Sequence, residues 1–101
     1  MIINGLRWRV RLVSPAHPLL LTPWRTHAYG VCDKTTQTIC IDETLSPHHL
    51  KEVLCHEIVH AFLHESGLSA HCDWATEECV DWFAMQYVKI VNAVDTMIQE
   101  E

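Results

Sequence analysis

The stretch "SPHHLKEVLCHEIVHAFLHESG", residues 46 to 67, decides the architecture of this chain. Ser46 is a preferred N-cap and Pro47 suits the first helical position. Gly67 can end a helix because it adopts the left-handed conformation easily. Between these ends the sequence predicts one long helix with a core-facing stripe at spacings of three and four. The stripe consists of Leu50, Leu54, Ile58 and Ala61.

The side of this helix opposite the stripe carries two histidines and a glutamate in the order H-E-x-x-H, a pattern that binds zinc in many metalloproteases. At 100° per residue His56 and His60 lie about 40° apart, so both rings can reach one ion. Glu57 would project beside that ion and can take a proton from its bound water. An ordinary polar helix surface is the alternative. The apolar neighbours favour the metal site: Val53, Val59 and Leu63.

A third metal ligand is predicted in the stretch "TEECVDWFA", residues 76 to 84. Glu77 and Asp81 are four residues apart and therefore share one face of a second helix. We expect Glu77 to complete a set of two histidines and one glutamate around zinc. Asp81 would then accept a hydrogen bond from the distal nitrogen of a ligand histidine. Glu78 is the competing third ligand. Less favoured candidates are His64 and His71.

The remaining ligand position separates a catalytic site from a structural one. A catalytic zinc keeps this position for water, whereas a structural zinc closes it with a fourth side chain. Glu57 favours the catalytic reading, because a structural site needs no general base. A fourth ligand at His71 or Cys72 would favour the structural reading. Leu63 and Ser66 stand where a metzincin needs Gly and His, which excludes that class.

The rest of the chain predicts a small sheet and a second helix. "LRWRVRLV", residues 6 to 13, alternates apolar and basic residues as a half-buried strand does. Residues 14 to 23 contain three prolines and are expected to form a loop. "HAYGVCD" and "TQTICID", residues 27 to 33 and 36 to 42, predict a hairpin.

The second helix is expected to begin after Asp73 and to run to about Gln99. We therefore predict an α+β fold, with a small antiparallel or mixed sheet of about three strands packed on two main helices. The whole chain, 1–101, is expected to form a single domain. The apolar face of the second helix consists of Val80, Phe83, Ala84, Tyr87, Val88 and Val91.

Charge and composition argue against several other functions. The formal net charge is −6, and nucleic-acid binding depends on clustered Lys and Arg. Arg7, Arg9 and Arg11 alternate along a predicted strand and are interpreted as a solvated face. No run approaches the roughly 20 apolar residues that span a bilayer, and no signal peptide is recognisable. We expect no nucleic-acid or membrane partner and a cytoplasmic protein. Its five reduced cysteines should act mainly as small buried apolar residues.

The motifs "LCHEIVHAFLHESG" and "EECVDWFA" together resemble the small gluzincin-type zinc peptidases of the ImmA/IrrE kind, including the minigluzincins and short phage-encoded relatives. The resemblance covers roughly residues 28 to 90. Two positions depart from the family's usual residues: Asp81 stands where Asn is common, and Val80 where Ala is common. Larger gluzincins use Asp, so the first departure does not weaken the predicted site.

The resemblance implies that the single domain, 1–101, is a zincin-like metallopeptidase with one zinc ion that hydrolyses peptide bonds of a protein substrate. That substrate would be a regulator, such as a phage repressor, in a bacterial or phage-infected cell. The "TQTICID" strand would be the sheet edge beside the cleft, where a peptide can add as a strand. The competing function is a non-catalytic, zinc-stabilised module that binds a regulatory protein. The residue that stabilises the oxyanion is left open among Tyr29, His64, His71 and Tyr87.

Overall fold

A three-stranded mixed sheet forms one layer of the molecule. The computed structural model describes residues 1–3, 5–22, 26–67 and 76–100. The strands are β3 (Arg9–Val13), β4 (Gly30–Asp33) and β5 (Thr38–Asp42), in the order β3-β5-β4. β3 runs parallel to β5, and β4 runs antiparallel to it. The α+β class and the small mixed sheet predicted from the sequence are confirmed.

The predicted hairpin is confirmed, but its second strand is not a sheet edge. β4 and β5 pair in register from Gly30 with Ile41 to Asp33 with Thr38. The Asp33 carboxylate accepts hydrogen bonds within the turn, including one from the backbone of Thr35 at 3.0 Å. β5 is the central strand because β3, from far earlier in the chain, pairs with its other side. The expectation of "TQTICID" as the edge beside the cleft was wrong, and β4 holds an edge position instead.

The predicted strand over residues 6–13 is split at Trp8. β2 (Leu6–Arg7) pairs with β1 (Ile2–Ile3), whereas β3 pairs with β5. Trp8 lies between them and is buried in the main core. The predicted inward face of β3 is exposed at Val10 and Leu12, so the expected half-buried strand was wrong there, and Val13 is the one buried residue of β3. A short 3-10 helix, η1 (Pro18–Leu20), lies within the predicted loop.

Helix α1 (Pro47–Glu65) covers one face of the sheet, and both of its predicted ends are confirmed. The Ser46 hydroxyl accepts a hydrogen bond from the backbone N–H of His49 at 3.3 Å, and Gly67 has a φ of +75°. The predicted stripe packs into the core as expected. Ala61 is fully buried there, and the other three members lie against the same cluster. That cluster is Ile3, Trp8, Ile39, Ile41 and Ala61.

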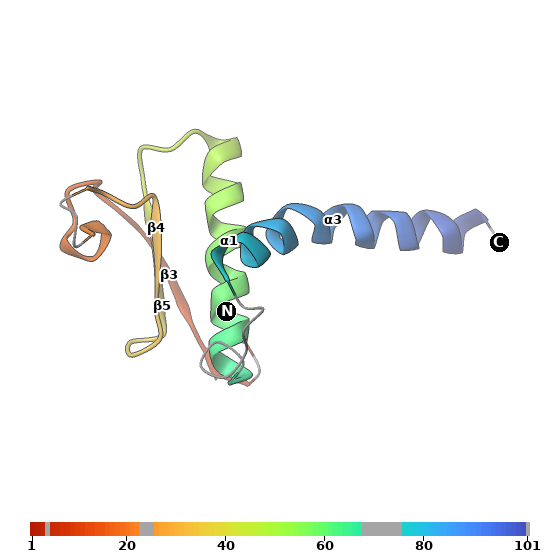
Figure 1. Ribbon diagram of the computed structural model, residues 1–101, viewed down its shortest axis with the longest axis horizontal. Helices are drawn as coiled ribbons and strands as arrows, with labels where there is room; N and C mark the ends of the chain where they lie inside the picture. Colours follow the sequence, from red (N-terminus) through yellow and green to blue (C-terminus); the bar gives the residue numbers. More distant parts are fainter. Residues whose placement is uncertain (4, 23–25, 68–75, 101) are drawn as a thin grey trace.

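Helix α3 (Glu77–Glu100) packs mainly on α1 rather than on the sheet. The Thr76 hydroxyl caps its start by accepting a hydrogen bond from the Cys79 N–H at 3.2 Å. The predicted start after Asp73 falls in residues 68–75, outside the described part of the chain. Figure 1 shows α3 crossing α1 and continuing well beyond it, away from the sheet. Of its predicted apolar face only Val80 and Ala84 are buried, and the other four residues are exposed.

The cysteines and arginines follow the predictions in part. Cys32, Cys40, Cys55 and Cys79 are all free, but only Cys40 is buried and Cys79 is exposed. Cys72 lies outside the described residues. The three arginines of the predicted solvated face are exposed. Among the described residues no helix is long and apolar enough to cross a bilayer.

Candidate metal centre

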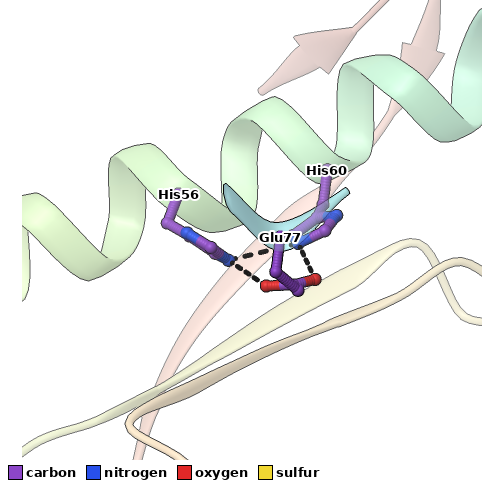
Figure 2. A group of neighbouring side chains, drawn as sticks. All are labelled: His56, His60 and Glu77. Carbon is purple, nitrogen blue, oxygen red and sulfur yellow. Dashed lines mark hydrogen bonds and ion pairs between the residues drawn. The ribbon is translucent and has the colours of Figure 1, made fainter. Parts of the chain in front are cut away.

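Two histidines of α1 and one glutamate of α3 converge at the point where the helices cross. The Nε2 atom of His56 lies 2.9 Å from Glu77 Oε2, and the Nε2 atom of His60 lies 2.8 Å from Glu77 Oε1. The two Nε2 atoms are 3.2 Å apart. Figure 2 shows both rings turned toward the Glu77 carboxylate. One donor atom from each residue thus lies within 4.8 Å of the others, a group that could hold a metal ion.

Local structure accounts for this convergence. His56 and His60 are one turn apart on α1 and therefore project in similar directions. Glu77 is the first residue of α3, where the unpaired backbone N–H groups favour an acidic side chain. The Thr76 cap fixes the chain direction just before it. The Glu77 side chain is 71% exposed, so the site opens to solvent on the α3 side.

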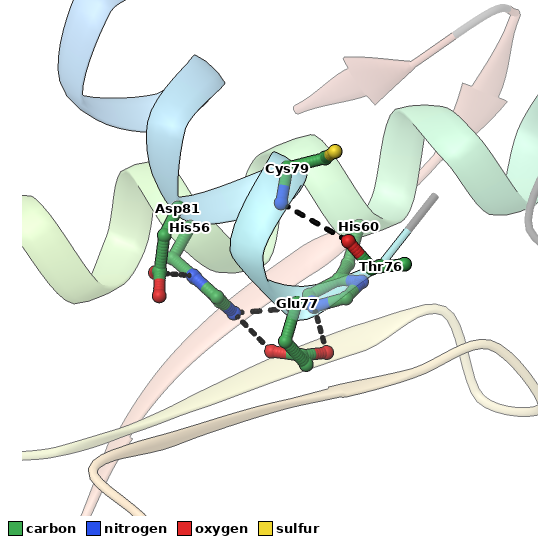
Figure 3. Close-up of polar contacts among 6 residues, drawn as sticks. All are labelled: His56, His60, Thr76, Glu77, Cys79 and Asp81. Carbon is green, nitrogen blue, oxygen red and sulfur yellow. Dashed lines mark hydrogen bonds and ion pairs between the residues drawn. The ribbon is translucent and has the colours of Figure 1, made fainter. Parts of the chain in front are cut away.

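Asp81 orients the first histidine, as the sequence predicted. Its Oδ1 atom lies 2.6 Å from Nδ1 of His56, on the ring side away from Glu77 (Figure 3). A carboxylate at this distance accepts a hydrogen bond, so Nδ1 carries a proton. In a neutral ring the Nε2 atom then presents its lone pair toward His60 and Glu77. Asp81 therefore holds His56 in the tautomer that a metal ligand requires.

A proton or a metal ion must lie between the donor atoms at the centre. A lone pair of His56 facing the carboxylate of Glu77 is repulsive unless a proton or a metal ion lies in between. Burial lowers the pKa of His60, although the nearby Glu77 charge opposes this effect, so His60 favours the neutral form that binds metals. Two ligands of a tetrahedral zinc at about 2.0–2.1 Å are about 3.3 Å apart. The two Nε2 atoms are 3.2 Å apart, close to this value, and each contacts a different oxygen of Glu77, so this donor set could hold a metal ion.

Glu57 lies beside the centre but is not part of the ligand group. It is only 7% exposed, so its carboxylate is largely removed from water. Burial raises the pKa of Glu57 to about 7; the charge of Glu77 adds to this, while His56 opposes it. A carboxyl group that titrates near neutral pH can both accept and donate a proton, which general acid–base catalysis requires.

Gly30 on β4 lets the strand approach α1 at Glu57. A Cβ atom added to Gly30 would lie 2.7 Å from Cγ1 of Val53 and 3.2 Å from Cγ of Glu57. Cys32 lies two residues further along the same face of β4 and is half-buried. Burial, and to a smaller extent the charge of Glu57, raises the pKa of its thiol to about 12. No role for Gly30 was predicted from the sequence. The available signal was a glycine inside a strand pattern, which often marks a close backbone approach.

The alternative ligands lie apart from the centre. Glu78 is exposed and borders a separate hollow beside Trp82. The ring of His64 stacks 6.3 Å from that of His60 but does not join the ligand group. His71 and Cys72 fall outside the described residues.

Two of the oxyanion candidates have contacts of their own. Tyr29 packs edge-on against the ring of His49, with ring centres 4.8 Å apart. The hydroxyl of Tyr87 accepts a hydrogen bond from Cys55 Sγ at 3.7 Å. Neither contact places a donor at the centre, so the oxyanion-stabilising residue stays open.

One comparison with known proteins gave a match. A family model described as the IrrE N-terminal-like domain, from a family of peptidases, matches residues 17–98. The match begins earlier and ends later than the span of about 28 to 90 expected from the motifs. No curated protein and no solved structure matches the chain significantly.

Proposed function

We propose that this chain, which belongs to the IrrE N-terminal-like family of peptidases, is a zinc-dependent peptidase that hydrolyses peptide bonds of a protein substrate. Family membership supports a metallopeptidase function in general. The observation that carries the finer proposal is the convergence of His56 Nε2, His60 Nε2 and the Glu77 carboxylate, with Asp81 on the far side of His56.

In the proposed site His56, His60 and Glu77 hold one zinc ion, and Asp81 fixes the orientation of the His56 ring. When bound, zinc lowers the pKa of its water to about 7 and polarises the scissile carbonyl. Glu57 takes the proton from the attacking water and later gives it to the leaving nitrogen. Its buried position beside the ligands, and its pKa near 7, suit both transfers.

The proposed substrate path follows the free edge of β4. This strand pairs with β5 on one side only, among the described residues, and approaches α1 at Gly30. An extended peptide can add to such an edge through main-chain hydrogen bonds. A peptide paired there would pass beside Glu57. We propose a regulatory protein as substrate by analogy with the family, in the cytoplasm of a bacterial or phage-infected cell.

The test combines metal content with cleavage of a mixed protein substrate. Glu57→Gln should retain zinc and lose turnover, because it removes the proton acceptor but no ligand. Glu77→Gln should bind zinc at least about tenfold more weakly. Glu78→Gln is the matched control, since it makes the same change one residue away on the exposed surface, and it should alter neither quantity.

Three outcomes would contradict the proposal. Turnover that survives in Glu57→Gln would reject this residue as the general base. If Glu77→Gln kept full zinc affinity and Glu78→Gln lost it, Glu78 would be the third ligand in place of Glu77. A chain that binds zinc at these residues but cuts no protein in a broad panel would favour the non-catalytic binding module.

A further inference from the structure

The apolar face of α3 continues far beyond its contact with α1. Apolar residues recur along the helix at alternating spacings of four and three, and we call these six residues the seam. The first two members, Val80 and Ala84, are buried against α1. The next four follow on the same face but are 38%, 51%, 52% and 65% exposed. These four, in chain order, are Tyr87, Val91, Val94 and Ile98.

The exposed part of the seam is flanked by further apolar side chains, so the face is wide. At 100° per residue the seam and its neighbours span about half of the helix circumference. Figure 1 shows the C-terminal half of α3 extending alone from the rest of the molecule. A helix with so wide an apolar face gains its stability by packing against a partner. The exposed neighbours are Phe83, Val88, Ile90 and Met97.

The area of this face matches the requirement of a specific interface. Eight large apolar side chains, each roughly half exposed, present on the order of 700 Å² on one chain. The largest apolar patch of a typical monomer is about 300–600 Å². Two such faces packed together would bury about 1,400 Å² in total, within the usual range of about 1,200–2,000 Å² for stable complexes.

We propose that α3 pairs with α3 of a second copy of this chain, through the exposed half of the seam. The alternating three-and-four spacing is the pattern by which two helices interlock side chains along their length. Because the pattern runs along one face of a single helix, the same face can serve on both copies.

A membrane surface is a less suitable occupant of this face. Helices that lie in the membrane interface carry Lys and Arg on their polar side, which contacts anionic lipids. The polar side of the exposed half of α3 offers Lys89 as its one cation within residues 85–99. The acidic net charge of −6 works against the same contact.

Sedimentation equilibrium of the full chain over a wide concentration range tests the proposal. We expect a reversible monomer–dimer equilibrium in the wild type. Val91→Glu with Val94→Glu should raise the dissociation constant at least about tenfold, because it places four charges in the seam of the dimer. The matched control is Met85→Glu with Ala93→Glu, which adds the same charge to the exposed polar side and should leave the dimer intact. Circular dichroism verifies that each variant keeps its helices.

Two outcomes would overturn the proposal. A wild type that stays monomeric at every concentration would overturn the proposal and leave the face to a different protein. A dimer equally sensitive to the seam variant and its control would overturn it as well.

Discussion

Helices α1 and α3 carry similar apolar patterns but have different surroundings. The stripe of α1 meets the sheet along the length of the helix, and α1 also receives α3 on its other side. The seam of α3 meets α1 only at its start, because the two helices cross and α3 then continues past its support. The spacing of apolar residues therefore identifies which face of a helix must be packed against another element. Whether another element of the same chain packs there depends on how the elements cross.

The largest expected difference between the helices is in the effect of a Glu→Gln substitution, made at Glu57 on α1 and at Glu78 on α3. In the metal-free protein, folded Glu57 has a pKa of about 7 against an ordinary value of 4.5. The folded chain therefore keeps this proton as pH rises, while the unfolded chain releases it. The free energy of unfolding should fall as pH rises from about 4.5 to about 7 and stay low above that. Glu57→Gln removes this loss and should stabilise the protein at about pH 8 by on the order of 3 kcal/mol.

Urea unfolding at about pH 5 and pH 8 measures this effect. Glu78→Gln on the exposed surface of α3 serves as the control and should change stability by less than about 0.5 kcal/mol at either pH. If the advantage of Glu57→Gln were the same at both pH values, it would not come from ionisation of a buried carboxyl group.

A second comparison uses one isoleucine on each helix. Ile58 packs against the main core, so Ile58→Ala should destabilise the protein by about 2–3 kcal/mol. Ile90 is 50% exposed on α3, and Ile90→Ala should cost less than about 0.5 kcal/mol in dilute solution. Denaturant titrations at low protein concentration measure both. Equal losses would mean that α3 is covered to the same degree as α1 in the single chain.

The smallest of these effects concerns the strand side of α1. Gly30→Ala places a methyl group 2.7 Å from Cγ1 of Val53, so either the strand or the helix must shift. We expect a loss of about 1–2 kcal/mol from overpacking. Adding Val53→Ala provides room, so the double variant should lose less than the two single losses together. Strict additivity would show that β4 is not pressed against α1 at this point.

Local signals explain what the sequence predicted about the fold. The Ser46 cap, the α1 stripe and the β4–β5 hairpin depend on residues close together in the chain, and all are confirmed. The central place of β5 depends on β3, which joins it from the other side of a long connection. No local pattern in "TQTICID" indicates this pairing. The alternation over residues 6–13 likewise predicted a strand but not the interruption at Trp8.

The site was more predictable than the fold around it, because its geometry follows helix periodicity. The spacing of His56 and His60, and that of Glu77 and Asp81, places each pair on one face, and the structure brings these four residues together. That they bind zinc stays a prediction. The approach of Gly30 to Glu57 depends on sheet order and packing, which explains why the sequence did not reveal it.

The proposed ligands belong to two different helices, so ion binding would also hold these two helices together. His56 and His60 belong to α1, whereas Glu77 begins α3, whose main contact with the rest of the chain is α1 itself. An ion held by all three would act as a removable cross-link between the helices, closing the intervening loop. The supply of metal would then determine how firmly α3 is attached as well as whether the chemistry can proceed.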